Sequence, residues 1–201
     1  MKYKEKEKLW LGSVKNLCKA YGWRFKGYFI FKSVGDLFFC SNFYMGRDKN
    51  EISGWLGYKP MIIDNVFWDI IDEEANKKMP LSFRGEAAFC VRDIHYFEYK
   101  IAIENELNPS VEITQLLKNI EGKVLEKLSE SKTLEDFRND MMTEEKRNTV
   151  GIVTSYIEEG RIEQALTKIK EYRANEFWSG FGFGDKDFYD LAKEFCEKKY
   201  N

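Results

Sequence analysis

His95 is the only histidine in the chain, so any histidine-based acid–base chemistry would depend on it. Asp93 lies two residues earlier and shares its face if this stretch is a strand. Two residues on the same face of one strand do not supply the alignment of acid, histidine and nucleophile that a triad needs. We therefore predict no catalytic residue and treat His95 as a candidate binding residue, with an ordinary strand histidine as the alternative.

Four carboxylates gather at the end of an expected helix: Asp69, Asp72, Glu73 and Glu74. Asp69 and Asp72 are three residues apart, so they could share a helix face and hold a divalent cation. No phosphate-binding loop accompanies them, and a solvated helix end is the simpler interpretation. The four cysteines are far apart and form no Cys-x-x-Cys pair, which favours buried thiols over a zinc site. We predict no metal site and no cofactor.

A glycine-rich segment, Gly180-Phe-Gly182-Phe-Gly184, precedes the last expected helix. Backbone N–H groups of such a loop can bind phosphate at a helix N-terminus. We therefore treat these three glycines as candidate phosphate-binding residues. The spacing differs from the dinucleotide-binding and P-loop patterns, and the segment before it is helical rather than a strand. The alternative is a helix–helix connection that Phe181 and Phe183 anchor to the core.

A strand that contains two large amphipathic rings is the third candidate. Trp55 and Tyr58 are separated by Gly57, and Gly54 precedes them. Tryptophan and tyrosine are enriched at binding hot spots, and glycines in a strand often mark a bulge or a close approach of the backbone. The segment could line a binding groove, although packing in the core explains the same residues.

Composition limits the classes of partner. The net charge of -2 gives no overall attraction to phosphate, so we predict no nucleic-acid binding, unless a local basic face forms around Arg24, Lys26 and Lys32. The charged N-terminus lacks the apolar core of a signal peptide, and every apolar run is shorter than the roughly 20 residues of a membrane span. We therefore expect a cytoplasmic protein without a membrane anchor.

The hydrophobic pattern predicts an α+β fold in which helices flank an antiparallel sheet. Period-two alternation and aromatic runs predict strands near residues 23–32, 37–45, 52–59 and 86–103. Helical periodicity and capping residues predict helices at 7–21, after Asp64, after Asn108-Pro109, after Thr133, on both sides of Gly160, and from Asp187 to about Lys199. We expect a sheet domain over 1–107 and a helical region over 108–201 that packs with it as one unit.

The first half of the chain resembles a bacterial family known as domain of unknown function 4304. The resemblance rests on an opening helix before Gly22-Trp-Arg-Phe-Lys-Gly27, on Gly54-Trp-Leu-Gly57, and on the downstream pair Phe67-Trp68. It covers about residues 7–103 and leaves the helical tail unexplained. It implies a bacterial α+β binding module and assigns no site residues.

Abundant aromatic residues without a convergent catalytic set favour a protein-interaction module, for example one that neutralises a toxin or serves in defence. A metal- or nucleotide-dependent hydrolase that uses the acidic cluster or the glycine-rich segment is the alternative. The oligomeric state stays open at this point.

Overall fold

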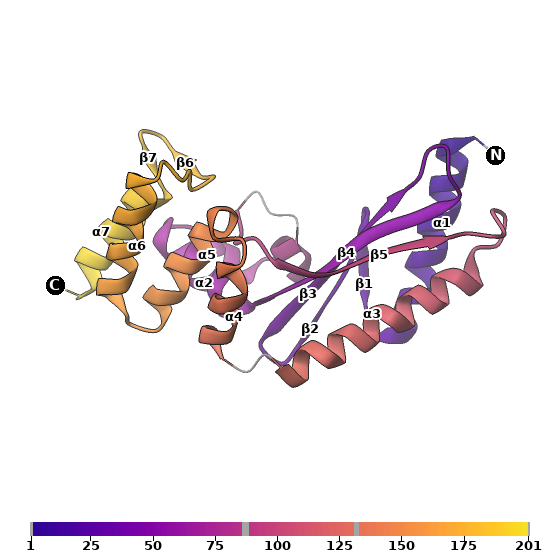
Figure 1. Ribbon diagram of the computed structural model, residues 1–201, viewed down its shortest axis with the longest axis horizontal. Helices are drawn as coiled ribbons and strands as arrows, with labels where there is room; N and C mark the ends of the chain where they lie inside the picture. The colour runs from indigo at the N-terminus through magenta and orange to yellow at the C-terminus, as the bar shows by residue number, and fades with distance from the viewer. Residues whose placement is uncertain (1, 86–88, 131–132, 201) are drawn as a thin grey trace. The chain divides into compact units, whose positions relative to one another are not determined.

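The computed structural model describes residues 2–85, 89–130 and 133–200. An N-terminal helix leads into a five-stranded antiparallel sheet, and helices make up most of the C-terminal part (Figure 1). The expected α+β class is therefore confirmed. Among the described residues, no helix is both long enough and apolar enough to cross a membrane.

The contacts between residues group the chain into two compact units, and each unit is built from two separate segments. Residues 1–58 and 93–131 form the first unit, and residues 59–92 and 132–201 form the second. The chain therefore passes three times from one unit to the other. The helix that follows the sheet, which the sequence places in the helical region, groups with the sheet.

The first unit combines the sheet with two long helices. Its helical segments are α1 (Tyr3–Leu17), η1 (Cys18–Tyr21) and α3 (Ser110–Glu130). Its strands are β1 (Arg24–Lys26), β2 (Phe29–Val34), β3 (Leu37–Met45), β4 (Glu51–Pro60) and β5 (Ile94–Ala102), and they lie side by side in chain order. β4 continues into the second unit, and the chain returns at β5. Helix α1 contacts α3 and β1, and α3 also contacts β5.

Two of the predicted strand boundaries are wrong. The stretch 23–32 is two strands, because Gly27 adopts a left-handed conformation (φ +57°) that reverses the chain between β1 and β2. The stretch 86–103 contains a strand only from Ile94 onward. Its first three residues lie outside the described residues, and Phe89 to Asp93 form no strand.

Glycines in β4 act as the sequence predicts. The register with β5 shifts between Leu56 and Gly57, which is a β-bulge. A Cβ added at Gly54 would overlap the backbone oxygen of Asn42 and would lie 2.5 Å from the hydroxyl of Tyr99. Gly54 is therefore a point of close approach between neighbouring strands.

Glu121 bonds helix α3 to side chains of the sheet region. Its carboxylate accepts hydrogen bonds from Lys32 Nζ at 2.6 Å and from Trp23 Nε1 at 3.0 Å. Lys32 is almost fully buried, so its charge serves this ion pair rather than the basic face considered above. The ion pair with Lys32 and the hydrogen bond from Trp23 together hold the helix on the sheet.

The second unit is mostly helical. Its elements are α2 (Met61–Ile70), η2 (Glu74–Lys78), η3 (Leu81–Gly85), α4 (Leu134–Met142), α5 (Glu145–Glu158), α6 (Ile162–Ala174), β6 (Gly182–Phe183), β7 (Lys186–Asp187) and α7 (Phe188–Tyr200). Thr133 and Asp136 form the expected capping box at the start of α4. Gly160 (φ +70°) separates α5 from α6, as predicted. Helix α2, however, begins directly after Pro60, and Asp64 is a buried residue of its first turn rather than its cap.

Candidate functional site

The outer edge of β5 is the longer of the two edges of the sheet. β5 is the last strand in the sheet order, and in the described part of the chain no strand lies on its far side. Unpaired N–H and C=O groups along such an edge are a template for another strand. The opposite edge is formed by β1, which has only three residues. β5 has nine residues and so offers a much longer edge.

One hydrogen bond shows the phase of the β4–β5 ladder, that is, which residues of β5 direct their backbone groups towards β4. The N–H of Ile103 donates to the carbonyl oxygen of Asn50 at 2.7 Å, one residue pair beyond the paired strands. In an antiparallel pair, alternate residues direct both backbone groups to the same neighbour. The odd-numbered residues in this part of β5 therefore face β4. Glu98, Lys100 and Ala102 direct their N–H and C=O groups to the outer edge.

An open pocket of about 950 Å³ lies where the end of β5 meets the first turns of α3. Its lining comes from the strand end, the connecting loop and the helix: Ile101, Ala102, Glu104, Asn105, Asn108, Ser110, Val111, Glu112, Thr114, Gln115, Leu116, Lys118 and Asn119. Leu116 is buried and Val111 is 75% exposed. The pocket therefore presents apolar surface beside amide side chains.

The loop between β5 and α3 is held by Glu112. Its carboxylate accepts a hydrogen bond from the backbone N–H of Glu104 at 2.9 Å. The N–H of Glu112 itself, and then those of Glu104 and Asn105, hold the pKa of this carboxyl below its ordinary value of 4.5. Glu112 is therefore ionised at neutral pH, and it keeps the pocket wall in place.

Charges of both signs lie along the outer edge. Glu98 and Lys100 are exposed and point to the same face of the sheet, because they are two residues apart in a strand. Lys100 pairs across the ladder with Glu51 at 3.0 Å, although 60% of its side chain stays exposed. This edge combines exposed charges with backbone groups that are directed outward.

Two of the predicted binding residues, Trp55 and His95, lie together. Their rings are stacked with centroids 3.6 Å apart and an interplanar angle of 18°. They lie diagonally across the strand pair, because Trp55 pairs with Glu98 and His95 pairs with Gly57. The side chain of Asp93 lies over Gly57, so any side chain there would overlap it. The glycine noted in the sequence thus makes room for a carboxylate rather than for a ligand.

Tyr58 is separated from this pair. It is fully buried, its ring stacks on Phe39 at 6.2 Å, and it meets Tyr96 edge-on at 5.5 Å. The ammonium group of Lys127 lies 4.8 Å from the centre of its ring. Tyr58 is therefore part of the aromatic core, in agreement with the alternative that the sequence left open.

The predicted phosphate-binding glycines belong to a small hairpin in the second unit. Gly182 pairs with Asp187 between β6 and β7, and Gly180 and Gly184 have positive φ angles. Phe181 packs on Phe67, with ring centroids 4.8 Å apart. The aromatic anchoring that the sequence suggested is present, and it fixes a hairpin rather than an extended connection.

The acidic cluster at the end of α2 is part of the surface. Asp69 forms an ion pair with Lys77, and Asp72 adopts a left-handed conformation with φ +59°. Glu73 and Glu74 are exposed. Across the described ranges, no group of three or more His, Cys, Asp or Glu side chains is arranged to hold a metal ion.

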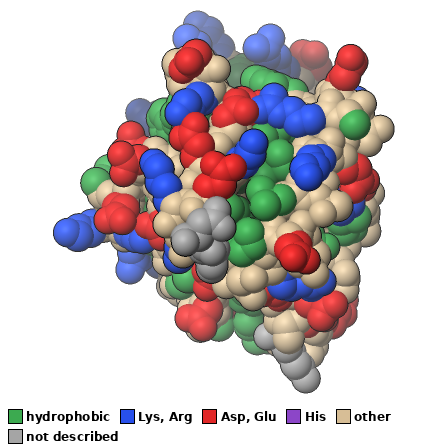
Figure 2. Space-filling model, turned by 90° about the vertical axis from the view of Figure 1, so that its left-hand side faces the viewer, with side chains coloured by type: hydrophobic (Ala, Val, Ile, Leu, Met, Phe, Trp, Pro, Cys, Tyr) green, Lys and Arg blue, Asp and Glu red, His purple; other side chains and the backbone are tan. Residues whose placement is uncertain are grey.

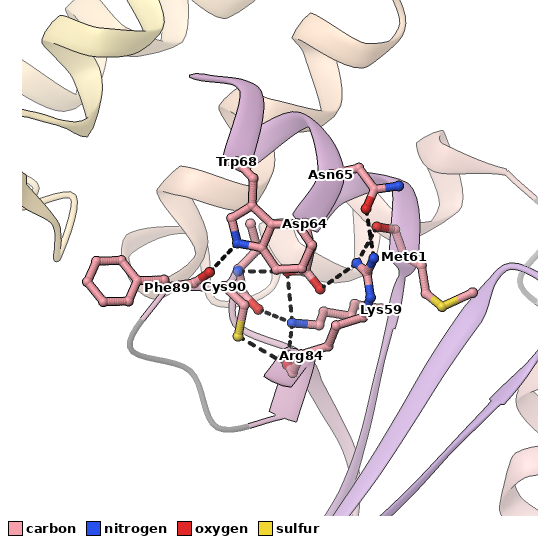
Figure 3. A network of polar contacts seen from close by, with 9 residues as sticks. Lys59, Met61, Asp64, Asn65, Trp68, Arg84, Phe89 and Cys90 are labelled. Carbon is pink, nitrogen blue, oxygen red and sulfur yellow. Dashed lines mark hydrogen bonds and ion pairs between the residues drawn. The ribbon is translucent and has the colours of Figure 1, made fainter. Parts of the chain in front are cut away.

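A buried polar network lies at the start of α2 (Figure 3). The sequence patterns do not predict it. Lys59 Nζ donates to Asp64 at 3.0 Å and to the carbonyl oxygens of Arg84 and Val91 at 2.8 and 2.6 Å. Arg84 in turn bonds Asp64 at 3.1 Å and Asn65 at 2.7 Å. These bonds tie the residues on both sides of 86–88 to α2. The network satisfies its own charges, so we assign it a structural role.

Acidic and basic side chains are interspersed on the face of the molecule that Figure 2 displays. This mixed charge agrees with the near-neutral composition.

Comparison with known proteins does not assign the chain to a family: no protein-family model, no curated protein and no solved structure matches it. The resemblance to domain of unknown function 4304 stays a prediction.

Proposed function

We propose that this chain is a protein-interaction module that binds an extended polypeptide strand along the outer edge of β5. The outward direction of the backbone groups of Glu98, Lys100 and Ala102 is the observation that carries the proposal. In strand addition, main-chain hydrogen bonds supply affinity, and neighbouring pockets select side chains. The pocket beside α3 lies at the end of the same edge.

The chemistry of the pocket supports this kind of ligand. Gln115 and Asn119 are one helical turn apart, and the amide of Gln115 donates to Asn119 at 3.0 Å. Amide side chains can exchange such a bond for one to a peptide backbone. Val111 offers an exposed apolar contact on the same helix.

We also infer a cytoplasmic location, because all four cysteines lie in the described part of the chain and none forms a disulfide.

A proline substitution tests the proposal. The N–H of Lys100 points away from β4, so Lys100→Pro removes a donor from the outer edge and none from the β4–β5 ladder. Peptides selected against the wild-type chain from a random library are expected to lose at least about tenfold in affinity for Lys100→Pro, because a backbone bond is lost and the proline ring blocks the edge. Fluorescence anisotropy would measure the affinity.

Lys100→Ala is the matched control, because it removes the same charge and keeps the N–H. It is expected to bind selected peptides within a few-fold of wild type. Circular dichroism would establish that both variants keep the fold. Selected peptides that bind Lys100→Pro as tightly as wild type would refute strand addition at β5.

A further inference from the structure

We infer that the strand accepted by β5 is β5 of a second copy of this chain, so that two sheets join edge to edge in a symmetric dimer. This inference rests on the proposed function, since it names the occupant of the same edge. Symmetric pairing requires that the edge be complementary to itself. The phase of the ladder and the order of charges along β5 supply that complementarity.

The backbone allows only a few registers. Residues that exchange hydrogen bonds across the new pair must both direct their backbone groups outward, and these are the even-numbered residues Glu98, Lys100 and Ala102. Centring the two-fold axis on Glu98 or on Lys100 would place like charges opposite each other. Centring it on Tyr99 places Glu98 of each copy opposite Lys100 of the other.

The register centred on Tyr99 therefore forms two opposite-charge pairs on one face of the joined sheet. Directly opposite pairs of unlike charge stabilise a sheet, and like pairs destabilise it. The side chain of Lys100 is 60% exposed despite its contact with Glu51, so it can also reach a second carboxylate. Glu98 is exposed on the same face.

The opposite face of the same register is apolar. Phe97 of one copy would lie opposite Ile101 of the other, and both side chains are only partly buried. Ile101 lines the pocket beside α3, so the phenylalanine of the second copy would cover that apolar surface. One register thus satisfies the backbone, the charges and the apolar side chains together.

Charge reversal provides a test that depends on the register. Glu98→Lys and Lys100→Glu each convert both opposite-charge pairs into like-charge pairs, so each variant alone is expected to dimerise about tenfold or more weakly than wild type. In an equimolar mixture, one variant presents two lysines and the other two glutamates. The mixed dimer regains both pairs and is expected to return towards wild-type affinity.

Sedimentation equilibrium between about 1 μM and about 1 mM covers the dissociation constants of weak and moderate dimers. A concentration-dependent dimer in wild type, loss in each variant and recovery on mixing would support the inference. A wild-type chain that stays monomeric throughout would overturn it, as would a dimer that both charge reversals leave unchanged. Hydrogen exchange of wild type, which needs no substitution, should show the amides of Glu98 and Lys100 protected only at high concentration.

The two proposals fail in different ways. A monomeric chain whose selected peptides still depend on the N–H of Lys100 would retain strand addition and remove self-pairing. A dimer that Lys100→Pro leaves intact would remove self-pairing at β5, and strand addition would fall with it only if the selected peptides also bound Lys100→Pro as tightly as wild type.

Discussion

Tyr99 lies across Gly54 on the neighbouring strand and donates its hydroxyl to the backbone oxygen of Asn42. The hydroxyl also lies 3.0 Å from Ser41 Oγ. Burial raises the pKa of Tyr99, so the hydroxyl keeps its proton and remains a donor. One side chain thereby links three strands, from β5 across β4 to β3. This arrangement is possible only because residue 54 has no Cβ.

Gly54→Ala is therefore expected to lower the free energy of unfolding by about 3 kcal/mol, since an added methyl group overlaps a backbone oxygen that cannot move away easily. Gly122→Ala is the control. It lies within α3 with nothing within 4 Å of the added atom, so it should raise the free energy of unfolding by about 1 kcal/mol. Urea denaturation would measure both. Equal effects of the two substitutions would contradict the close approach at Gly54.

The buried pair Lys59 and Asp64 predicts a large and non-additive loss of stability. Asp64→Asn leaves Lys59 and Arg84 without their shared buried counter-ion, and Lys59→Met leaves Asp64 with Arg84 as its remaining counter-ion, so the first should cost about 3–5 kcal/mol and the second somewhat less. The double substitution Lys59→Met/Asp64→Leu removes both charges and should cost less than the sum of the singles. Lys77→Met, which breaks an ion pair whose side chains are 35% and 26% exposed, should cost at most about 1 kcal/mol. Additive losses would argue against a coupled network.

Backbone strain at the end of α6 predicts a stabilising substitution. Glu176 is exposed and has a φ of +53°, a conformation that glycine adopts without steric cost. Glu176→Gly is expected to raise the free energy of unfolding by about 1 kcal/mol, whereas Glu176→Ala keeps the strain and should change little. Gly160→Ala places a side chain at φ +70° and should have the opposite sign. A thermal melt in which Glu176→Gly lowers stability would refute this account.

Glu145 predicts part of the dependence of stability on acid. Burial tends to raise its pKa, but hydrogen bonds from Lys168 at 2.8 Å and Tyr172 at 3.0 Å outweigh burial and leave the pKa below 4.5. A carboxyl whose pKa is lowered by folding stabilises the folded state above its ordinary pKa. That contribution is lost as the pH falls through the lowered value.

Glu145→Gln should therefore lower the free energy of unfolding at pH 7 and reduce its change between neutral pH and about pH 3. Urea denaturation at a series of pH values would measure this slope. Glu171→Gln is a suitable control, because Glu171 also pairs with Lys168 but is 46% exposed. If Glu171→Gln reduced the slope as much as Glu145→Gln, the effect would belong to the general charge of the surface.

Sequence patterns predict the element types well, and they fail where distant residues decide the structure. The strand at 37–45 is found as expected, because its aromatic run is long and bounded by turns. The sequence pattern does not reveal the break at Gly27, because large rings recur at odd positions on both sides of it and the alternation appears continuous. The start of α2 was misplaced because Asp64 has the type of a capping residue but is used by Lys59, Arg84 and Val91 instead.

The candidate site was only partly predictable for the same reason. The residue types of Trp55 and His95 make both of them candidates, but their stacking depends on the pairing of two strands that are far apart in the chain. The outer edge of β5 was missed, because strand order decides which strand lies at an edge. Glu98 and Lys100 look like ordinary surface charges until the ladder phase is known.

The division of the chain into two interleaved segments per unit has a consequence for inheritance and engineering. Neither unit is encoded by one uninterrupted stretch, so a single recombination event cannot transfer either of them intact to another gene. A truncation after residue 131 would keep 59–92 while deleting the rest of its unit. Exchanging one unit for another would instead require three matched junctions, near residues 58, 92 and 131.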